Sequence, residues 1–170
     1  MEFDYVVVGA GSSGCVVANR LSQCGRYSVA LIEAGPSDNN PWIHVPVGYF
    51  KTMGNPKSDW CYKTQPDPGI AGRSIPWPRG RVLGGSSSIN GLLYVRGQPQ
   101  DFDTWSQLGC TGWSWDDVLP YFKRSEKWDG VDDSGLRGKD GPLSVQSSRL
   151  NRDIVAVSYT HLTLPTSQLV

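Results

Sequence analysis

The chain has 170 residues, enough for one ordinary domain but too few for a nucleotide-binding domain joined to a complete substrate domain. Its 16 Lys and Arg residues balance 16 Asp and Glu residues, so nothing indicates a nucleic-acid partner. The four cysteines have no metal-binding spacing, and we expect reduced, mostly buried thiols. No signal peptide precedes the first apolar run and no run has membrane-spanning length, so we expect a cytoplasmic protein, with peripheral membrane association as an alternative.

The first elements in chain order form a predicted strand, helix and parallel strand. An apolar strand over residues 6–8 leads into a glycine-rich turn, and an Ala/Val/Leu-rich helix follows over residues 13–21. The helix is expected to end near Gly25, and a second strand covers residues 27–33. This βαβ order is typical of nucleotide-binding α/β domains.

The glycines of that turn have the spacing GxGxxG. Gly9 permits the tight turn, Gly11 lets the backbone approach a pyrophosphate, and Gly14 lets the helix pack closely on the strand. The pyrophosphate is then expected at the helix N-terminus, where free N–H groups favour negative charge. Glu33, at the end of the second strand, is placed to bind an adenosine ribose and to repel a 2′-phosphate.

A long segment without helical or strand periodicity follows at residues 37–77. It is rich in Pro, Gly, Asn and aromatic residues, which predicts a functional lid or an interface; an ordered surface excursion is the alternative. Gly84 and Gly85 then form a second glycine turn, with Ser86 or Ser87 expected to cap a helix that begins there.

Arg79 and Arg81 flank this second turn, which makes it a candidate anion site; a plain glycine loop with surface arginines is the alternative. Further helices are predicted over residues 101–108 and from Ser114 onward. The second of these has an apolar stripe that we interpret as core, made of Trp115, Val118, Leu119 and Phe122. Residues 127–140 are predicted to form a polar loop, and residues 142–146 a short strand.

The stretch GRVLGGSSSIN, which ends at Asn90, is followed at fixed spacings by Tyr94, Gly97 and Asp103. Together with the βαβ unit it resembles the glucose-methanol-choline (GMC) family of flavin oxidoreductases, and the choline-dehydrogenase-like branch most of all. The resemblance covers residues 3–157. It implies an α/β fold: a Rossmann-type FAD-binding domain, incomplete because the chain is truncated.

The resemblance also implies how the chain is divided. Residues 1–140 would form the N-terminal FAD-binding domain, with the segment at 37–77 as its flavin lid and a subunit contact in a homodimer. Residues 141–157 would begin the substrate-binding domain. Residues 158–170 resemble translated adapter sequence, and we expect a non-native tail there.

FAD is the cofactor that the resemblance implies, and no metal is expected. Ile89 stands where some family members tether the flavin to a His, so noncovalent FAD is implied. The residues expected to contact it, carried over by position or by adjacency to the motifs, are Gly9, Gly11, Ser12, Ser13, Gly14, Glu33, Ala34, Arg81, Val82, Gly85, Ser86, Asn90, Gly91, Leu92 and Leu93.

Family members oxidise an alcohol to an aldehyde by hydride transfer to the flavin, with a His and a second His or Asn from the C-terminal part of the sequence. His44 and His161 are the two histidines of this chain, and neither lies in such a context, so we predict no catalytic residue and an inactive fragment of an active parent. The resemblance leaves the alcohol and the electron acceptor open. The alternatives are a nicotinamide-dependent Rossmann dehydrogenase, disfavoured because regular βα repeats would follow residue 33, and a noncatalytic nucleotide-binding fragment.

Overall fold

The computed structural model describes residues 2–147, which divide into two compact units at the Leu93–Tyr94 junction. That junction lies inside the predicted domain 1–140, and the predicted domain limits stay predictions. Residues 148–157 and the predicted tail at 158–170 lie outside the described residues. Within the described part, no helix combines the length and the apolar character needed to span a membrane.

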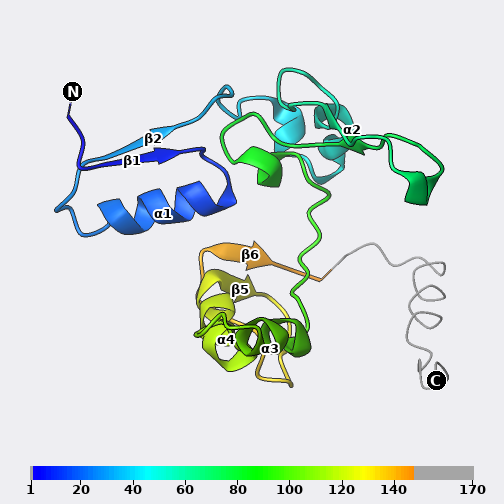
Figure 1. Ribbon diagram of the computed structural model, residues 1–170. Helices are drawn as coiled ribbons and strands as arrows, with labels where there is room; N and C mark the ends of the chain where they lie inside the picture. Colours follow the sequence, from blue (N-terminus) through cyan, green and yellow to red (C-terminus); the bar gives the residue numbers. More distant parts are fainter. Residues whose placement is uncertain (1, 148–170) are drawn as a thin grey trace, which may run out of the picture. The chain divides into compact units, whose positions relative to one another are not determined.

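The first unit begins with the predicted strand, helix and strand. β1 (Tyr5–Val8) pairs in parallel with β2 (Val29–Ile32), with Val8 opposite Ile32. The connection is α1 (Ser12–Ser22), which packs along one face of the pair (Figure 1). A parallel pair needs such a crossover, because a tight hairpin reverses the chain direction and so joins only antiparallel strands. The predicted βαβ unit is therefore confirmed.

The helix ends slightly before the predicted glycine. Its C-cap is Gln23, and Gly25 adopts a left-handed conformation two residues later, with φ +66°. The β1–β2 pair forms a two-stranded sheet within the described residues, and Val8 at its end is 81 % exposed. Apolar strand residues are thus left without a covering layer in this part of the chain.

The thiols differ from expectation. The prediction of mostly buried cysteines is wrong, since all four are free and exposed: Cys15, Cys24, Cys61 and Cys110. Cys24 and Cys110 lie just beyond the ends of helices, where the backbone turns at the surface. Cys15 lies on α1, and that helix packs against the sheet with one side only.

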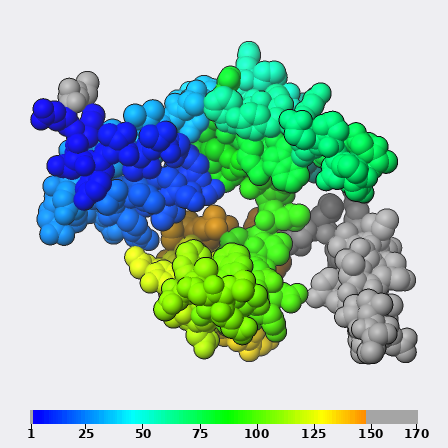
Figure 2. Space-filling view, in the orientation of Figure 1, coloured from blue at the N-terminus to red at the C-terminus, as the bar shows by residue number. Residues whose placement is uncertain are grey.

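The segment at residues 37–77 has no long regular element, as predicted. We call it the lid after its predicted role, which stays a prediction. Its longest helix is the four-residue α2 (Tyr49–Thr52), and its two strands, β3 (Tyr62–Lys63) and β4 (Pro76–Trp77), form a short antiparallel pair. Three 3₁₀ turns complete it: η1 (Pro41–Ile43), η2 (Pro46–Gly48) and η3 (Pro68–Ile70). Figure 2 shows its side chains as the cyan-to-green part of the surface.

Asp59 anchors the lid. Its side chain is 2 % exposed and accepts three backbone hydrogen bonds, from Gly54 N (2.7 Å), Cys61 N (2.9 Å) and Arg79 N (3.0 Å). The bonds to Gly54 and Cys61 hold the lid together, while the bond to Arg79 joins it to the chain that enters the second glycine turn. One buried carboxylate therefore connects two segments that are about 20 residues apart.

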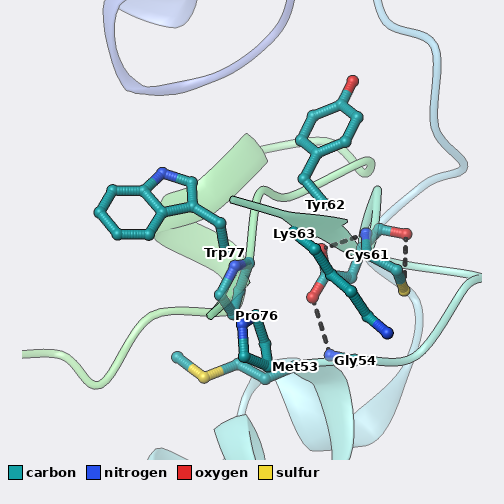
Figure 3. A pocket seen from close by; sticks show the side chains of 9 residues that line it. Met53, Gly54, Cys61, Tyr62, Lys63, Pro76 and Trp77 are labelled. Carbon is teal, nitrogen blue, oxygen red and sulfur yellow. Dashed lines mark hydrogen bonds between the residues drawn. The ribbon is translucent and has the colours of Figure 1, made fainter. Parts of the chain in front are cut away.

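A hollow of about 400 Å³ lies beside this anchor. In Figure 3, Met53, Pro76 and Trp77 lie along one side of it, with Cys61 and Lys63 across from them. None of the residues lining the hollow is among the predicted cofactor residues, so we do not assign the nucleotide site to it.

The second unit contains α3 (Pro99–Gln107) and α4 (Trp115–Ser125), joined by an aromatic cluster. Phe102 is its buried centre, with ring centroids 5.4 to 5.7 Å away in Trp105, Trp115 and Phe122. Two of these contacts are edge-to-face and one is tilted, and such ring pairs add to the stabilisation from buried apolar area. Trp115 and Phe122 of the predicted apolar stripe thus contact this cluster, while no residue of α4 is fully buried.

Helix α4 begins as predicted, with a capping box in which Ser114 and Asp117 bond to each other's backbone N–H groups. It leads directly into β5 (Glu126–Trp128), which pairs in parallel with β6 (Leu143–Val145). The loop predicted over 127–140 therefore begins at residue 129. Its first two residues belong to β5 because they pair with Ser144 and Val145 of β6. Local sequence does not reveal this pairing, since the partners lie far along the chain.

We predict that Asp59→Asn destabilises the protein by about 1–3 kcal/mol, the usual cost of leaving buried donors unpaired. Burial raises the pKa of Asp59, but the N–H groups of Gly54, Arg79 and Cys61 outweigh burial and hold the pKa below its ordinary value of 3.8. The stabilisation is therefore complete above pH 3.8 and is lost as the pH falls through the folded-state pKa. Urea unfolding at several pH values measures it.

Asp67→Asn is the matched control, because Asp67 caps an exposed turn through one bond to Gly69 N and asparagine caps such turns equally well. Equal loss of stability in both variants would contradict the role given to Asp59.

Candidate nucleotide-binding site

The two glycine turns meet in the first unit. Gly84 N donates to Ala10 O at 2.8 Å, and a Cβ built on Gly85 would lie 2.9 Å from the Cα of Gly11. Gly85 has φ +58°, a conformation that residues with side chains rarely adopt. Two turns separated by about 70 residues thus touch backbone to backbone because neither carries a side chain at the contact.

The first turn is held to both strands. Gly9 has φ +94° and donates from its N–H to Ile32 O at 2.7 Å, which ties the turn to the end of β2. A Cβ on Gly14 would lie 1.8 Å from Gly9 O, so α1 can begin this close to β1 only with glycine there. These geometries agree with the conformational roles predicted for Gly9 and Gly14.

The N-terminus of α1 has no capping side chain. Its N-cap is Gly11, and no acidic residue lies in its first turn. In α3 and α4, by contrast, a carboxylate of the first turn accepts a hydrogen bond from the backbone N–H of the N-cap residue. The first N–H groups of the helix, from Ser12 to Gly14, lack an intrahelical acceptor. They form a positive helix end that fits an anionic group.

Glu33 lies beside this turn, directly after β2. Its Oε2 accepts from Ala10 N at 2.8 Å and its Oε1 accepts from Gly35 N at 3.0 Å. A carboxylate has lone pairs for further donors, so these bonds leave room for the hydroxyls of a ribose. Sequence reasoning placed Glu33 at the site but missed both backbone bonds.

Gly35 completes the junction. A Cβ on it would lie 2.0 Å from Arg81 O, and Leu83 N donates to Pro36 O at 3.0 Å. The two glycine turns and the chain that follows β2 therefore converge. Of the predicted cofactor residues, they bring together Gly9, Gly11, Ser12, Ser13, Gly14, Glu33, Ala34, Arg81, Val82, Gly85 and Ser86.

The second turn differs from its prediction. Gly84 and Gly85 lead into the short 3₁₀ turn η4 (Gly85–Ser88), and its N-cap has no side-chain hydrogen bond. The expectation that Ser86 or Ser87 caps a helix is therefore wrong. Their hydroxyls have other partners: Ser86 Oγ accepts from Gly80 N, and Ser87 Oγ donates to Gly84 O, which closes a compact turn in place of a helix.

Arg81 points its guanidinium toward the lid. It lies 5.4 Å from the ring centroid of Trp60, and its Nη2 donates to Pro56 O at 2.8 Å. Its buried Nε has no hydrogen-bond partner among the described residues. Arg79 lies over Trp77 in the same way, 5.6 Å from the ring centroid. Both arginines stack on lid aromatics, so the second anion site and the contact of Arg81 with FAD stay predictions.

The remaining predicted residues lie on the segment that leaves η4. Asn90 Oδ1 accepts from Leu92 N at 3.0 Å, and Leu92 has φ +59°, which is unusual for a residue with a side chain. Leu92 and Leu93 are 57 % and 87 % exposed. The predicted roles of Asn90, Gly91, Leu92 and Leu93 in FAD binding stay predictions.

A parallel βαβ unit, a glycine turn at an uncapped helix N-terminus and an acid after the second strand define a Rossmann-type dinucleotide-binding domain. Residues 3–159 match the sequence family described as GMC oxidoreductase, in its N-terminal part. The chain belongs to the GMC oxidoreductase family, as the resemblance implied.

Curated relatives include the oxygen-dependent choline dehydrogenases of Brucella anthropi and Photobacterium profundum. The first is 50 % identical over 149 residues, 88 % of this chain and 27 % of the relative; the second is 50 % identical over 141 residues, 83 % of this chain and 25 % of the relative. The chain thus spans about a quarter of the length of these relatives.

Solved structures with the same fold include pyridoxine 4-oxidase from Mesorbium loti, 40 % identical with a TM-score of 0.78, over 84 % of this chain and 28 % of that one. An FAD-dependent oxidoreductase from Chaetomium thermophilum is 28 % identical with a TM-score of 0.78, over 94 % of this chain and 29 % of that one. The predicted fold class is confirmed by these matches.

We predict that Gly14→Ala lowers the free energy of unfolding by about 1–3 kcal/mol, since the added methyl must push α1 away from the Gly9 carbonyl. Denaturant unfolding measures the loss. Gly91→Ala is the control: a Cβ there meets no atom within 4 Å, and we expect little change. Equal losses in both variants would contradict the close contact at Gly14.

Proposed function

We propose that this chain is the FAD-binding N-terminal part of a longer flavoenzyme that oxidises the CH–OH group of a small alcohol, as a choline dehydrogenase does. The observation that carries the proposal is the uncapped N-terminus of α1, which faces the second glycine turn with Glu33 beside it. An adenine dinucleotide requires a positive helix N-terminus for its pyrophosphate, a glycine junction that lets it approach the backbone, and an acidic residue that binds its ribose.

The residues of the junction fit FAD. The N–H groups of Ser12 to Gly14 would bind the pyrophosphate, and Glu33 would accept hydrogen bonds from the adenosine ribose. Gly11 and Gly85 would let the cofactor lie against backbone. When bound, FAD supplies the acceptor for the substrate hydride; the residues of this chain bind and orient it.

The relatives support an alcohol substrate. Names of the matched proteins refer to choline and pyridoxine, whose oxidation takes place at a CH–OH group, and they favour FAD over the nicotinamide alternative. We assign no catalytic base to the described residues. His44, the one histidine among them, has its Nε2 2.7 Å from Asp38 O at the start of the lid.

A homodimer through the lid stays a prediction, as does the cytoplasmic location. Exposed aromatic side chains of the lid, among them Phe50, Tyr62 and Trp77, support the homodimer, because apolar surface of this kind favours burial against a partner.

The test of the proposed function is FAD binding to the full-length enzyme. Glu33→Ala removes a charged acceptor of the ribose, and we expect the dissociation constant of FAD to rise about 10- to 100-fold. Gly11→Ala is expected to weaken FAD binding while leaving folding intact, because a Cβ there comes no closer than 4.0 Å to the Cα of Gly85. Titration of the apoprotein by flavin fluorescence measures both. Unchanged affinity in both variants would refute this site.

We predict that the flavin is bound without a covalent link. Ile89 is buried and has no nucleophile at the position where tethered relatives have a His. Acid precipitation of the holoenzyme is expected to release all of the flavin into the supernatant, measured by its absorbance. Yellow colour retained by the washed protein pellet would contradict this prediction.

A further inference from the structure

The hollow beside Asp59 is a cavity that the proposed function does not use. It lies wholly within the first unit, and its volume of about 400 Å³ is typical of small-molecule pockets. Its lining comes from the strands β3 and β4, the residues next to them and the end of α2. A ligand bound here would therefore be separate from the residues expected to contact FAD.

The backbone around the hollow is held in place by Asp59. Its carboxylate accepts hydrogen bonds from Gly54 N at 2.7 Å and from Cys61 N at 2.9 Å, and both donors line the hollow. Cys61 has φ +54°, a conformation that a residue with a side chain keeps only where its surroundings hold it. The hollow is therefore preformed, and a ligand does not have to order it on binding.

The charges at the hollow favour an anion. Lys63 lines it and is exposed, and the ammonium group has no hydrogen bond or ion pair with the part of the chain that the structure describes. Asp59 also lines the hollow, but it is buried and its carboxylate is already occupied by three backbone N–H groups. Arg79 adds positive charge nearby, because its guanidinium lies 5.6 Å from the ring centroid of Trp77 in the lining. An anionic ligand is thus favoured over a cationic one.

The side of the hollow across from Lys63 is apolar. Met53, Pro76 and Trp77 form it, as Figure 3 shows. Trp77 is 50 % exposed, so part of its surface is open to a ligand. An aromatic ring gains from stacking on an indole and from contact with a thioether. A ligand with a ring at one end and an anionic group at the other contacts both sides of the hollow at once.

We propose that the hollow is a binding site for an aromatic carboxylate. The ring lies against Met53, Pro76 and Trp77, and the carboxylate accepts a charge-assisted hydrogen bond from the Lys63 ammonium. Binding involves no covalent step. The inference does not rest on the proposed function, because FAD contacts none of these residues in that proposal.

The experiment uses the full-length enzyme and 2-naphthoate as the probe. Calorimetric titration measures its dissociation constant. Alkylation of Cys61 by iodoacetamide, followed by peptide mass spectrometry, reports whether the probe covers the hollow. Cys24 is the internal reference, since it is exposed and does not line the hollow. 2-Naphthamide has the same rings without the charge, and pentanoate has the charge without a ring.

Three variants test the part played by the ammonium group. Lys63→Gln removes the charge and Lys63→Arg keeps it, while Lys57→Gln is the matched control, because Lys57 is an exposed lysine of the lid that does not line the hollow. We expect 2-naphthoate to slow alkylation of Cys61 but not of Cys24. Lys63→Gln is expected to raise the dissociation constant about three- to ten-fold, and the other two variants to change it little. Both control ligands are expected to bind more weakly than 2-naphthoate.

Several outcomes would overturn the proposal. Absence of binding, equal affinity for 2-naphthoate and 2-naphthamide, or equal effects of Lys63→Gln and Lys57→Gln would each do so. Cys61 that resists alkylation without the probe and becomes reactive on dilution would show that a second copy of the chain covers the hollow, since Trp77 also belongs to the surface proposed for the homodimer. If the enzyme binds no FAD but 2-naphthoate still protects Cys61, the proposed function fails and this site stands.

Discussion

The backbone contact between the two glycine turns is the constraint on which the candidate site depends. Gly84 N bonds Ala10 O, and Gly85 approaches Gly11 so closely that a methyl on Gly85 would collide. The contact places the second glycine turn against the N-terminus of α1. Because backbone polar groups have fixed positions, a junction built from them suits an anionic group.

Two carboxylates, of the half-buried Glu33 and the buried Asp59, organise the chain around this junction by the same means. Glu33 bonds the N–H groups of Ala10 and Gly35, and Asp59 bonds those of Gly54, Cys61 and Arg79. Each carboxylate extends a short strand pair, β1–β2 for Glu33 and β3–β4 for Asp59, into the loops beside it. In a region with little helix or sheet, hydrogen bonds from backbone N–H groups to carboxylates take the place of the backbone–backbone hydrogen bonds that stabilise more regular folds. Glu126 has a comparable place in the second unit, with Arg96 and Arg137 as partners.

The functional conclusion follows from site and family together. A βαβ unit alone fits several dinucleotides, since pyrophosphate and ribose are common to them. The stretch GRVLGGSSSIN and the match to GMC oxidoreductases select FAD. In the proposed function, the described residues bind and orient FAD, and no catalytic base is assigned among them.

The sequence by itself determined the βαβ unit, the conformations of Gly9 and Gly14, the capping box at Ser114, the apolar face of α4 and the family. These features depend on contacts within a few residues or on a long motif, so they can be read locally. Only the tertiary structure decided the exposure of the cysteines, the 3₁₀ turn at Gly85, the strand at Glu126 and the partners of Glu33, Asp59 and Arg96. Each of these depends on which distant segment lies opposite, and local propensity contains no information about that partner.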